Sequence, residues 1–364
     1  MTIPLPDAVP DPLDRAAPVR AGEELDASAL RAFLADRFPA RSGDHPVVEQ
    51  FPRGFSNLTY LVRWGGDEFI LRRPPFGGVS GTAHDVVREA RVLTALGRVY
   101  RQVPRVLAVC DDASTLGAPF YLMERVRGII LRDRAPAGVS LGAADMRRLS
   151  RTVVETLAAI HAVDYAAAGL ANLGTPAGYV ERQVAGWTKR YVAAATAPQP
   201  AVEEAAAWLA ANRPPERGAA LIHNDFKFDN LVLDAADPTR VLAVLDWEMV
   251  TVGDPLMDLG TSLAYWVERS DAPAIRALGL GITASPGALS RAEVVEHYAA
   301  VTGRAVDDAV FYFAYGLFKV AVIAQQIHAR WVRGFTSDPR FASLDQAVAA
   351  LGAAAARAIE TGRV

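Results

Sequence analysis

Short apolar runs separated by turn-forming residues dominate the first third of the chain. A Gly-Gly-Asp stretch at 65–67 stands between two such runs, as a hairpin turn does. Two longer segments, 25–38 and 83–96, instead place their apolar residues at helical spacing, and Asp26 or Ser28 could cap the first. This pattern predicts a five-stranded antiparallel sheet with an accompanying helix. The expected strands are 47–51, 58–64, 68–73, 105–110 and 120–126.

From residue 127 onward the pattern changes to alanine-rich segments with helical periodicity. Three short apolar runs interrupt these helices and look like strands that flank a polar loop. We therefore predict an α+β chain with a flexible tail (1–22), a β-rich first lobe (23–126) and a mostly helical second lobe (127–364). The expected strands of the second lobe are 220–223, 231–233 and 241–245. Its expected helices are 144–163, 177–195, 202–212, 254–267, 291–301, 307–331 and 343–359.

The pattern of a secretion signal or of a membrane span is not found in the sequence. Residues 1–20 hold five prolines and several aspartates, without a basic stretch followed by an apolar one. The most apolar long run, 311–327, is interrupted by Lys319, Gln325 and Gln326. It stays below the roughly 18 uncharged residues that spanning requires. We expect no membrane as a partner.

Composition and charge narrow the class of protein further. With 364 residues, 51% of them hydrophobic, the chain can bury a large core, which excludes a disordered scaffold. Its formal net charge of -3 gives no electrostatic reason to expect nucleic acid or an anionic membrane as the main partner. Because Cys110 is the only cysteine, no intrachain disulfide can form, which fits a cytoplasmic protein.

The polar loop of the second lobe carries the strongest chemical signal. It reads His-Asn-Asp-Phe-Lys-Phe-Asp-Asn over 223–230, and Asp246 follows about sixteen residues later, at the end of an apolar run. Phosphoryl transfer needs a carboxylate beside the attacking hydroxyl, cations on the phosphates and oxygen ligands for Mg²⁺. The loop and Asp246 together supply residues of all three kinds.

Each of these residues can be given a role in such a reaction. Asp225 would accept or orient the acceptor hydroxyl, and Lys227 could meet the transferring phosphate. Asn230 and Asp246 would present oxygens to Mg²⁺. His223 is interpreted as a residue that braces the loop by hydrogen bonding rather than one that does chemistry. The alternative for the whole segment is a polar turn between two strands.

This spacing resembles the catalytic loop of the protein-kinase-like superfamily, with Asp246 where its metal-binding aspartate would fall. Five further segments resemble the aminoglycoside phosphotransferase family, in particular its branch related to the N-terminal domain of acyl-CoA dehydrogenase family members 10 and 11. The resemblance covers roughly 25–335. It implies a bilobal protein-kinase-like fold, ATP and Mg²⁺ as cofactors and a small-molecule hydroxyl as acceptor. The segments are Phe-Ser-Asn-Leu-Thr-Tyr (55–60), Phe-Ile-Leu-Arg-Arg-Pro-Pro (69–75), Arg-Glu (88–89), Phe-Tyr-Leu-Met-Glu-Arg-Val (120–126) and Gly-Asp-Pro-Leu-Met-Asp-Leu-Gly (253–260).

The resemblance also assigns the side of the site that would hold the nucleotide. A cation on the third strand would reach the α- and β-phosphates, and a glutamate on the next helix would hold that cation. Arg72 and Glu89 occupy these positions. Arg72 departs from the usual lysine, but it stays cationic and can bind a phosphate or carboxylate with two hydrogen bonds. Arg73 would face the other way in a regular strand.

Two further segments are candidates for contacts with the nucleotide. Ser56 and Asn57 follow Gly54 in a loop between strands, where a glycine lets backbone N–H groups approach a phosphate and a serine adds a donor. An ordinary hairpin turn explains this loop about as well. By resemblance, the backbone of Glu124 and Val126 would pair with adenine, and an edge strand at this place is compatible with that role.

The start of the helix expected at 254–267 carries two aspartates with different predicted roles. Asp254 before Pro255 indicates a helix start, since aspartate caps free N–H groups and proline is tolerated at the first helical position. Asp258, one turn further, resembles the family aspartate that holds the catalytic loop in place. Plain solvation of a helix face is the other interpretation of Asp258.

The acceptor is the least determined part of the prediction. Only about eight residues separate Asp246 from Asp254, which is short for a segment that docks a peptide. Family resemblance favours a hydroxyacyl-CoA or similar metabolite, whereas polycationic aminoglycosides would need a strongly acidic pocket. Choline-like alcohols and a nucleotide-binding module without activity are the alternatives. Four cations could meet an anionic acceptor, although the solvated face of a helix explains them better: Lys319, His328, Arg330 and Arg333.

Overall fold

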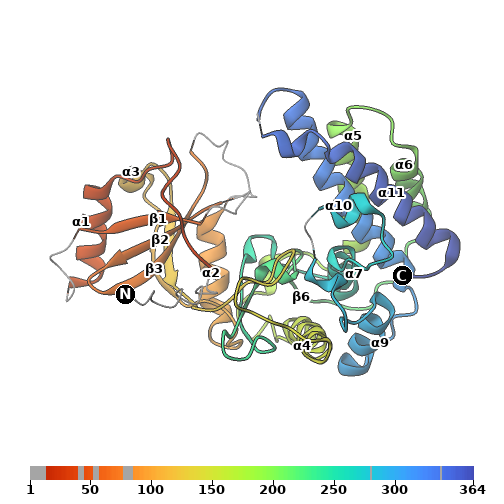
Figure 1. Ribbon diagram of the computed structural model, residues 1–364, viewed down its shortest axis with the longest axis horizontal. Coiled ribbons are helices and arrows are strands. Elements are labelled where there is room, and N and C mark those ends of the chain that lie inside the picture. Colours follow the sequence, from red (N-terminus) through yellow and green to blue (C-terminus); the bar gives the residue numbers. More distant parts are fainter. Residues whose placement is uncertain (1–13, 40–44, 52–56, 77–84, 279–280, 337) are drawn as a thin grey trace, which may run out of the picture.

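The structure is a computed structural model that describes residues 14–39, 45–51, 57–76, 85–278, 281–336 and 338–364. Its first lobe contains a five-stranded sheet in which all neighbouring strands run antiparallel, in the order β1-β2-β3-β5-β4. Figure 1 shows this lobe at one end of the molecule and the helical lobe at the other. The elements of the first lobe are α1 (Ala27–Arg37), β1 (Val47–Gln50), β2 (Leu58–Trp64), β3 (Asp67–Arg73), α2 (Val86–Leu96), β4 (Val106–Cys110), α3 (Ala113–Leu116) and β5 (Phe120–Glu124).

The β2–β3 hairpin explains why the sheet forms where the sequence predicts it. Gly65 and Gly66 have φ values of 58° and 83°, and a two-residue hairpin turn needs such positive values at both positions. The turn sets the register, in which Trp64 pairs with Asp67. All five expected strands are present, with ends that differ by at most two residues. Asp26, one of the two expected caps, caps α1.

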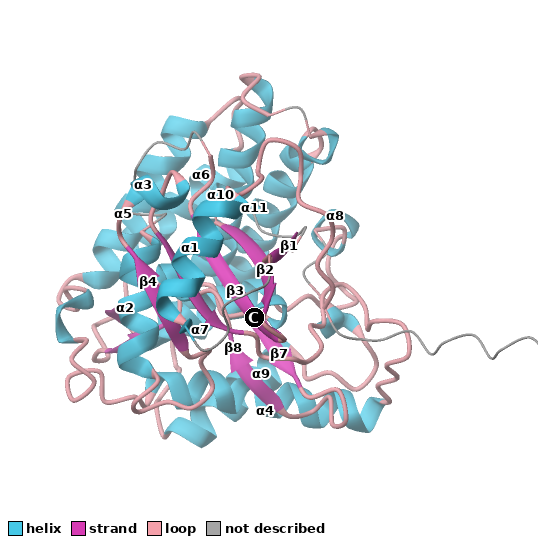
Figure 2. Cartoon of the chain, turned by 90° about the vertical axis from the view of Figure 1, so that its left-hand side faces the viewer, coloured by secondary structure: helices cyan, strands magenta, loops and turns pink. Residues whose placement is uncertain are grey.

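Each face of the sheet is covered by a helix, because successive residues of a strand point to opposite faces. Tyr60 belongs to the apolar cluster that contains Leu30 and Leu34 of α1. Leu61 and Ile70 belong to the other cluster, which contains the buried residues of α2. Figure 2 looks from the side of this lobe and shows the sheet in front of the helices of the second lobe.

The second lobe is built around a long central helix, α10. This helix packs against α7 and α11. Two glycines allow the close crossing of α7 and α10, since a Cβ on Gly316 would lie 2.0 Å from the backbone oxygen of Gly260. The helices are α4 (Ala143–His161), α5 (Tyr179–Ala194), α6 (Pro200–Ala211), α7 (Pro255–Tyr265), α8 (Pro273–Arg276), α9 (Arg291–Thr302), α10 (Ala309–Val332) and α11 (Leu344–Thr361). Of these, only the four-residue α8 was not expected from the sequence.

By length and composition, α10 would also qualify as a membrane span, which the sequence pattern does not predict. However, 78% of its most apolar window is buried inside the protein. A helix that is apolar all round is typical of the interior of a large domain as well as of a membrane. The surrounding helices therefore account for the apolar character of α10.

Two small antiparallel ribbons frame the polar loop of the second lobe. β6 (Ala220–Ile222) pairs with β9 (Thr251–Gly253), and β7 (Leu231–Leu233) pairs with β8 (Val241–Val244). Three of these strands were expected. β9 was not, because its three residues give no readable alternation and its pairing with β6 spans about thirty residues of chain.

Residues 14–22 contact the first lobe and the start of the second, which differs from the expected loose tail through residue 22. Ala17 forms a β-bridge with Gln50 at the end of β1, and the side chain of Gln50 accepts a hydrogen bond from the backbone of Arg20 (3.0 Å). Asp14 forms an ion pair with Arg132 (2.8 Å). The edge strand β1 has free backbone groups that this segment satisfies, and such pairing leaves no periodicity in the sequence. Residues 1–13 lie outside the described part, and the exact division of the chain into lobes stays a prediction.

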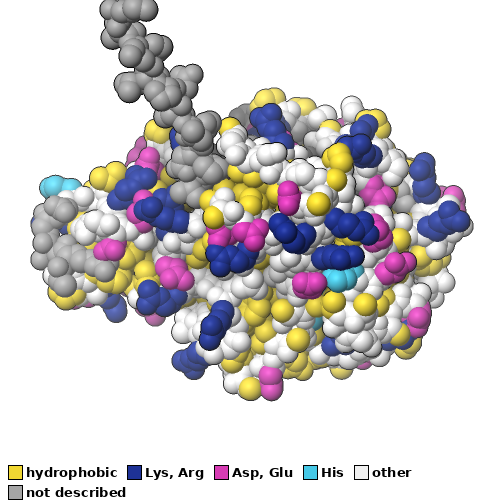
Figure 3. Space-filling model, turned by 60° about the horizontal axis from the view of Figure 1, so that its bottom comes forward, with side chains coloured by type: hydrophobic (Ala, Val, Ile, Leu, Met, Phe, Trp, Pro, Cys, Tyr) yellow, Lys and Arg dark blue, Asp and Glu magenta, His cyan; other side chains and the backbone are white. Residues whose placement is uncertain are grey.

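Figure 3 shows one face of the molecule, on which basic and acidic side chains are interspersed over both lobes. A one-signed patch of the kind that attracts nucleic acid is not visible among the described residues of this face. Only this face is visible in the view. The expectation that nucleic acid is not a partner stays a prediction.

Candidate active site

The loop at 223–230 joins β6 to β7 and is anchored by an aspartate of α7. Asp258 is fully buried and accepts hydrogen bonds from the backbone N–H groups of His223 (2.7 Å) and Asn224 (2.8 Å). Burial favours a raised pKa for Asp258, but the hydrogen bond and the charge of His161 outweigh it, so that the pKa lies below its usual value. The contacts are those of a residue that holds the loop, and a solvated helix face is excluded for Asp258.

Asn224 brings the chain into the geometry that Asp225 needs. Its φ of 67° lies in the left-handed region, which is uncommon for non-glycine residues but which asparagine adopts more readily than most. The side chain of Asn224 makes two hydrogen bonds that hold this conformation. Its Nδ2 donates to the backbone oxygen of Met249 (3.0 Å), and its Oδ1 accepts from the hydroxyl of Tyr179 (3.2 Å). The side chain of Asn224 therefore fixes the turn before Asp225.

The Asp225 carboxylate contacts two other residues of the loop. Lys227 Nζ lies 2.8 Å and 3.0 Å from its two oxygens, and Asn230 Nδ2 donates to it at 3.1 Å. Burial opposes the charge of Lys227, but Asp225 more than compensates and raises the pKa of the ammonium. Lys227 Nζ also lies 4.9 Å from the centre of the Tyr265 ring. Burial raises the pKa of the Tyr265 hydroxyl above its usual value, and the charge of Asp225 and a hydrogen bond with it raise this pKa further.

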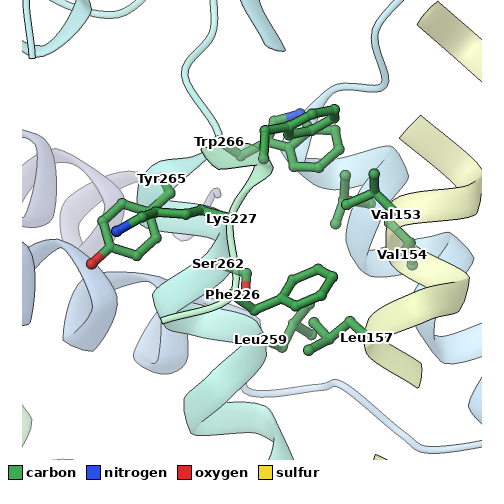
Figure 4. A pocket seen from close by; sticks show the side chains of 11 residues that line it. Val153, Val154, Leu157, Phe226, Lys227, Leu259, Ser262, Tyr265 and Trp266 are labelled. Atoms are coloured by element: carbon green, nitrogen blue, oxygen red, sulfur yellow. The ribbon is translucent and has the colours of Figure 1, made fainter. Parts of the chain in front are cut away.

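Successive side chains of the loop point in different directions. Figure 4 shows Lys227 lying beside the Tyr265 ring, whereas Phe226 points towards Leu157 and Leu259. Phe226 is almost completely buried in the helical core. The apolar residues between the polar ones thus anchor the loop and leave Asp225 and Lys227 together at its surface.

His223 ties the loop to the segment that carries Asp246. Its Nε2 lies 2.9 Å from the backbone oxygen of Leu245, and its Nδ1 accepts from the N–H of Asp225 at 3.3 Å. Because Nδ1 accepts, this network assigns the proton to Nε2, which donates to Leu245. The ring is fully buried and lies 4.8 Å from that of Trp247. These contacts fit the bracing role predicted for His223.

Arg72 on β3 contacts three carboxylates from the side of the site that lies opposite the loop. Its guanidinium lies 3.0 Å from Glu89, 2.5 Å from Asp246 and 3.2 Å from Glu248. Glu248 in turn accepts a hydrogen bond from Asn57 Nδ2 (2.8 Å). The arginine found in place of the usual lysine thus keeps the expected pair with Glu89 and adds two further acidic partners.

Burial and pairing oppose each other in this cluster. Burial disfavours the charge of Arg72, but Asp246 and Glu89 raise its pKa well above the usual value. Burial likewise opposes the charge of Asp246, but Arg72 lowers its pKa. For Glu89 the burial effect is larger than that of Arg72, so its pKa is raised. Pairing with Arg72 thus lowers the pKa of Asp246, but it does not overcome the effect of burial at Glu89.

A cleft of about 410 Å³ joins the two walls. Its lining includes most of the predicted site residues, while Glu89, His223 and Asp258 support it from behind. Ser56 lies outside the described residues. The predicted residues that line the cleft are Asn57, Arg72, Glu124, Val126, Asp225, Lys227, Asn230 and Asp246.

The donor set fits a magnesium ion that is held mainly by a bound nucleotide. Among the described residues, no group of three or more His, Cys, Asp or Glu side chains forms a metal cluster. Mg²⁺ usually binds one or two protein carboxylates and takes its other oxygens from phosphates and water. Asp246 offers a carboxylate. Asn230 uses its Nδ2 to contact the backbone oxygen of Asp225 (2.8 Å), so its amide oxygen is the atom suited to a cation.

Sequence reasoning did not assign Glu248 and Tyr265 to the site. Glu248 stands two residues after Asp246, and this spacing was the available signal. Tyr265 ends α7 and lines the cleft. It comes close to Asp225 and Lys227 only through the packing of α7 against the loop. Its sequence neighbourhood, a hydrophobic helix, gives no indication of a site.

The four cations near the end of the chain do not form one solvated helix face. Lys319 and His328 are buried, and His328 contacts the backbone oxygen of Phe341 (3.1 Å). Arg330 and Arg333 are exposed. The favoured interpretation was therefore wrong for the first two, because a helix with buried neighbours on most sides has no single solvated stripe.

The chain is similar to parts of longer curated proteins. It is 37% identical over 323 residues to acyl-CoA dehydrogenase family member 11 of Rattus norvegicus, covering 86% of this chain and 41% of the relative. It is 35% identical to family member 10 of Mus musculus, covering 88% of this chain and 30% of that protein. The chain thus spans less than half the length of these relatives.

Solved structures give the same picture of the fold. A crystal structure from Ralstonia eutropha, described only provisionally as an aminoglycoside phosphotransferase, has a TM-score of 0.76 and 32% identity, with 92% of this chain and 99% of that chain covered. A mutant of aminoglycoside phosphotransferase APH(4)-Ia in a ternary complex with ADP and hygromycin B has a TM-score of 0.57 and 17% identity, with coverages of 89% and 97%, and shows the fold alone. The profile of the phosphotransferase enzyme family, APH, matches residues 47–292. The chain belongs to this family.

Proposed function

We propose that this chain transfers the γ-phosphoryl group of ATP to the hydroxyl of a small molecule, with Mg²⁺ as the metal. One observation carries the proposal. The Asp225–Lys227–Asn230 group and the Arg72–Asp246 pair line the same cleft, with Arg72 on the side of the first lobe and Asp246 beside the loop that carries Asn230. Phosphoryl transfer depends mainly on positioning and on charge stabilisation, and these side chains are suited to both.

Asp225 acts on the acceptor in this mechanism. Its carboxylate accepts a hydrogen bond from the acceptor hydroxyl, orients it and takes its proton as the new O–P bond forms. Lys227, now paired with Asp225, stabilises the negative charge of the phosphoryl oxygens. Because Lys227 contacts both Asp225 and the Tyr265 ring, its ammonium is preorganised for that task.

The other wall holds the nucleotide. Arg72 binds the α- and β-phosphates, and Glu89 and Glu248 keep its guanidinium in place. The backbone of Glu124 and Val126, at the start of the link between the lobes, pairs with the adenine. Asn230 and Asp246 would hold Mg²⁺, which supplies charge neutralisation on the phosphates when bound.

The acceptor proposed here is a hydroxyacyl-CoA or a similar metabolite with an apolar chain beside its hydroxyl. The cleft has an apolar side at the catalytic loop, made by Met249, Tyr265, Ile323 and Ile327. Ile323 and Ile327 are one helical turn apart on α10 and are only partly buried. An apolar side of this kind favours an acyl chain over a polycationic aminoglycoside. The similarity to acyl-CoA dehydrogenase family members supports the same choice.

The direct test is ATP consumption by the wild-type protein and by Asp225→Asn. Turnover should fall by a factor of about 10³, within the range of general base catalysis, while nucleotide affinity stays within about twofold because the residues of the other wall are intact. Asp36→Asn, an exposed aspartate on α1, is the matched control and should keep full turnover. Wild-type turnover in Asp225→Asn would remove the assigned role.

A panel of acceptors separates the proposed substrate from its alternatives. Hydroxyacyl-CoAs, aminoglycosides and choline should be compared at equal concentrations, with ADP formation as the readout. We expect the highest kcat/KM for a hydroxyacyl-CoA. Activity with choline or an aminoglycoside alone would select the other acceptor class. Nucleotide binding without ADP formation for any acceptor would favour a binding module.

A cytoplasmic location and the absence of nucleic-acid or membrane partners are part of the same proposal.

A further inference from the structure

Lys319 is a buried cation that the mechanism above does not use. It lies in the middle of α10 with 1% of its surface exposed, and its Nζ donates to the backbone oxygen of Asn224 at 2.7 Å. The ammonium also lies 5.7 Å from the centre of the Trp187 ring. A lysine charge is strongly hydrated in water, so a buried one needs a specific partner. The partner of Lys319 is the backbone carbonyl of Asn224, the residue before Asp225.

The hydrogen bond from Lys319 completes the set of contacts around Asn224. The N–H of Asn224 donates to Asp258, its side chain contacts Met249 and Tyr179, and its carbonyl accepts from Lys319. The carbonyl of Asn224 and the N–H of Asp225 belong to one planar peptide group. Holding that carbonyl therefore fixes the plane from which the Asp225 side chain projects.

The position of Lys319 on α10 links this contact to the wall of the cleft. Ile323 and Ile327 follow at intervals of four residues, so the three side chains lie along one stripe of the helix. Ile323 and Ile327 line the cleft, and Lys319 reaches the loop. One rigid helix thus contributes both to the acceptor wall and to the placement of the catalytic loop.

We propose that Lys319 is a positioning residue for phosphoryl transfer, whose ammonium holds the Asn224–Asp225 peptide so that the Asp225 carboxylate meets the acceptor hydroxyl. This inference rests on the proposed function, because it assigns a consequence to the placement of Asp225. It concerns kcat rather than nucleotide binding, since Lys319 is not among the residues that line the cleft.

The charge of Lys319 should depend on pH near neutrality. Burial lowers its pKa to about 8; the carboxylates of Asp258 and Asp225 act against this shift, while Lys227 and Arg190 add to it. Above this pH the amine becomes neutral and its bond to the Asn224 carbonyl weakens, since charge-assisted hydrogen bonds are the stronger ones. The wild-type kcat should therefore fall as the pH rises through about 8.

The dependence of folding stability on pH has the opposite sign. The pKa of Lys319 is lower in the folded than in the unfolded chain, so the unfolded chain binds more protons between the two values. The contribution of Lys319 to stability therefore improves as the pH rises from about 8 towards the unfolded value. A fall in kcat over this range cannot then come from a loss of stability at Lys319.

The experiment compares Lys319→Met, which keeps the length of the side chain without its charge, and Lys319→Arg, which stays charged at every pH used. Lys189→Met, at an exposed lysine of α5, is the matched control. The measured quantities are kcat and KM for ATP and for the acceptor between pH 6.5 and 9.5, together with thermal unfolding. All four proteins contain residues 1–364.

For Lys319→Met we expect kcat at neutral pH to fall between about tenfold and a hundredfold, as for small displacements of a catalytic group, with KM for ATP within about twofold. Its kcat should no longer fall near pH 8, and Lys319→Arg should also lack that fall. An unchanged pH profile in both variants, or an effect on KM alone, would overturn the proposal. If Lys319→Met does not fold, the profile of Lys319→Arg decides alone. An inactive wild type across the acceptor panel would instead contradict the proposed function.

Discussion

Arg72 meets three carboxylates in a place where each charge has lost most of its water. An arginine can do this because its planar guanidinium presents several N–H donors in fixed directions, whereas lysine presents one point charge. The distances to Glu89, Asp246 and Glu248 are all 3.2 Å or less. The substitution of the usual lysine is therefore part of a different charge network, and it does not indicate a lost one.

Removing the Arg72 cation from this network should lower the free energy of unfolding more than removing an exposed cation. Arg72→Met leaves three carboxylates facing each other, and we expect a loss of about 3–5 kcal/mol in the free energy of unfolding. The free energy of unfolding of Arg72→Lys should lie between those of the wild type and Arg72→Met, because lysine keeps the charge but lacks the planar guanidinium. Chemical denaturation and nucleotide affinity are the measurements. Arg63→Met removes a partly exposed arginine that pairs with Glu49 and Glu68, and it should cost about 1 kcal/mol or less.

At the scale of elements, the sequence predicted the sheet and the long helices because their signals are local. Alternation, helical spacing and the Gly65–Gly66 turn each act within a few residues, and the strand ends came out within two residues. Elements that depend on a distant partner were missed. β9 forms only against β6, and the segment around Ala17 is ordered by Gln50 of an edge strand.

The crossing of α7 and α10 is an element-level feature that supports the site. α7 carries Asp258, which contacts the N–H of Asn224, and α10 carries Lys319, which contacts its carbonyl. The two helices can hold one residue from two sides only while they stay close. Gly316 and Gly260 provide the space for this approach.

Gly316→Ala should therefore destabilise the protein although alanine is the better helix former. Its Cβ would lie 2.0 Å from the backbone oxygen of Gly260, which cannot move aside without shifting α7. We expect a loss of about 3 kcal/mol or more from overpacking, against a helix propensity gain of about 1 kcal/mol. Gly186→Ala on α5 is the control, since its Cβ would meet only the end of Arg190 at 3.6 Å. Equal unfolding transitions for the two variants would contradict this account.

At the scale of the whole molecule, the candidate site is a set of pairs that are far apart in the chain. Arg72 and Asp246 are separated by 174 positions, Asn57 and Glu248 by 191, and Lys319 and Asn224 by 95. Sequence reasoning identified the residue types that the chemistry needs, because these cluster in one loop. Apart from the Arg72–Glu89 pair, which the family resemblance implied, it could not predict which buried cation meets which carbonyl or carboxylate, since that depends on how the lobes and helices pack.

The N-terminal segment is a contact between lobes that only the whole molecule reveals. Asp14 pairs with Arg132, and its backbone oxygen accepts from Arg125 (3.1 Å), while Ala17 is bridged to β1. All three of Asp14, Arg125 and Arg132 line the cleft next to the link between the lobes. The segment therefore connects the sheet of the first lobe to the chain that enters the second.

Arg132→Met should weaken nucleotide binding and should cost the fold little stability. The pair with Asp14 is partly exposed, so the loss in unfolding free energy should stay below about 1 kcal/mol. If the segment keeps the lobes at the distance that nucleotide binding needs, losing the Asp14–Arg132 pair weakens nucleotide binding by the same free energy. KM for ATP should then rise by up to about fivefold. Arg147→Met, which breaks the exposed pair with Glu293 away from the cleft, should leave KM unchanged.

A double-mutant cycle with Asp14→Asn tests whether the effect of Arg132→Met belongs to the Asp14–Arg132 pair, because an effect of the pair disappears in the Asp14→Asn background. Additive changes in KM would mean that Arg132 acts on the nucleotide directly and that the segment does not link the lobes.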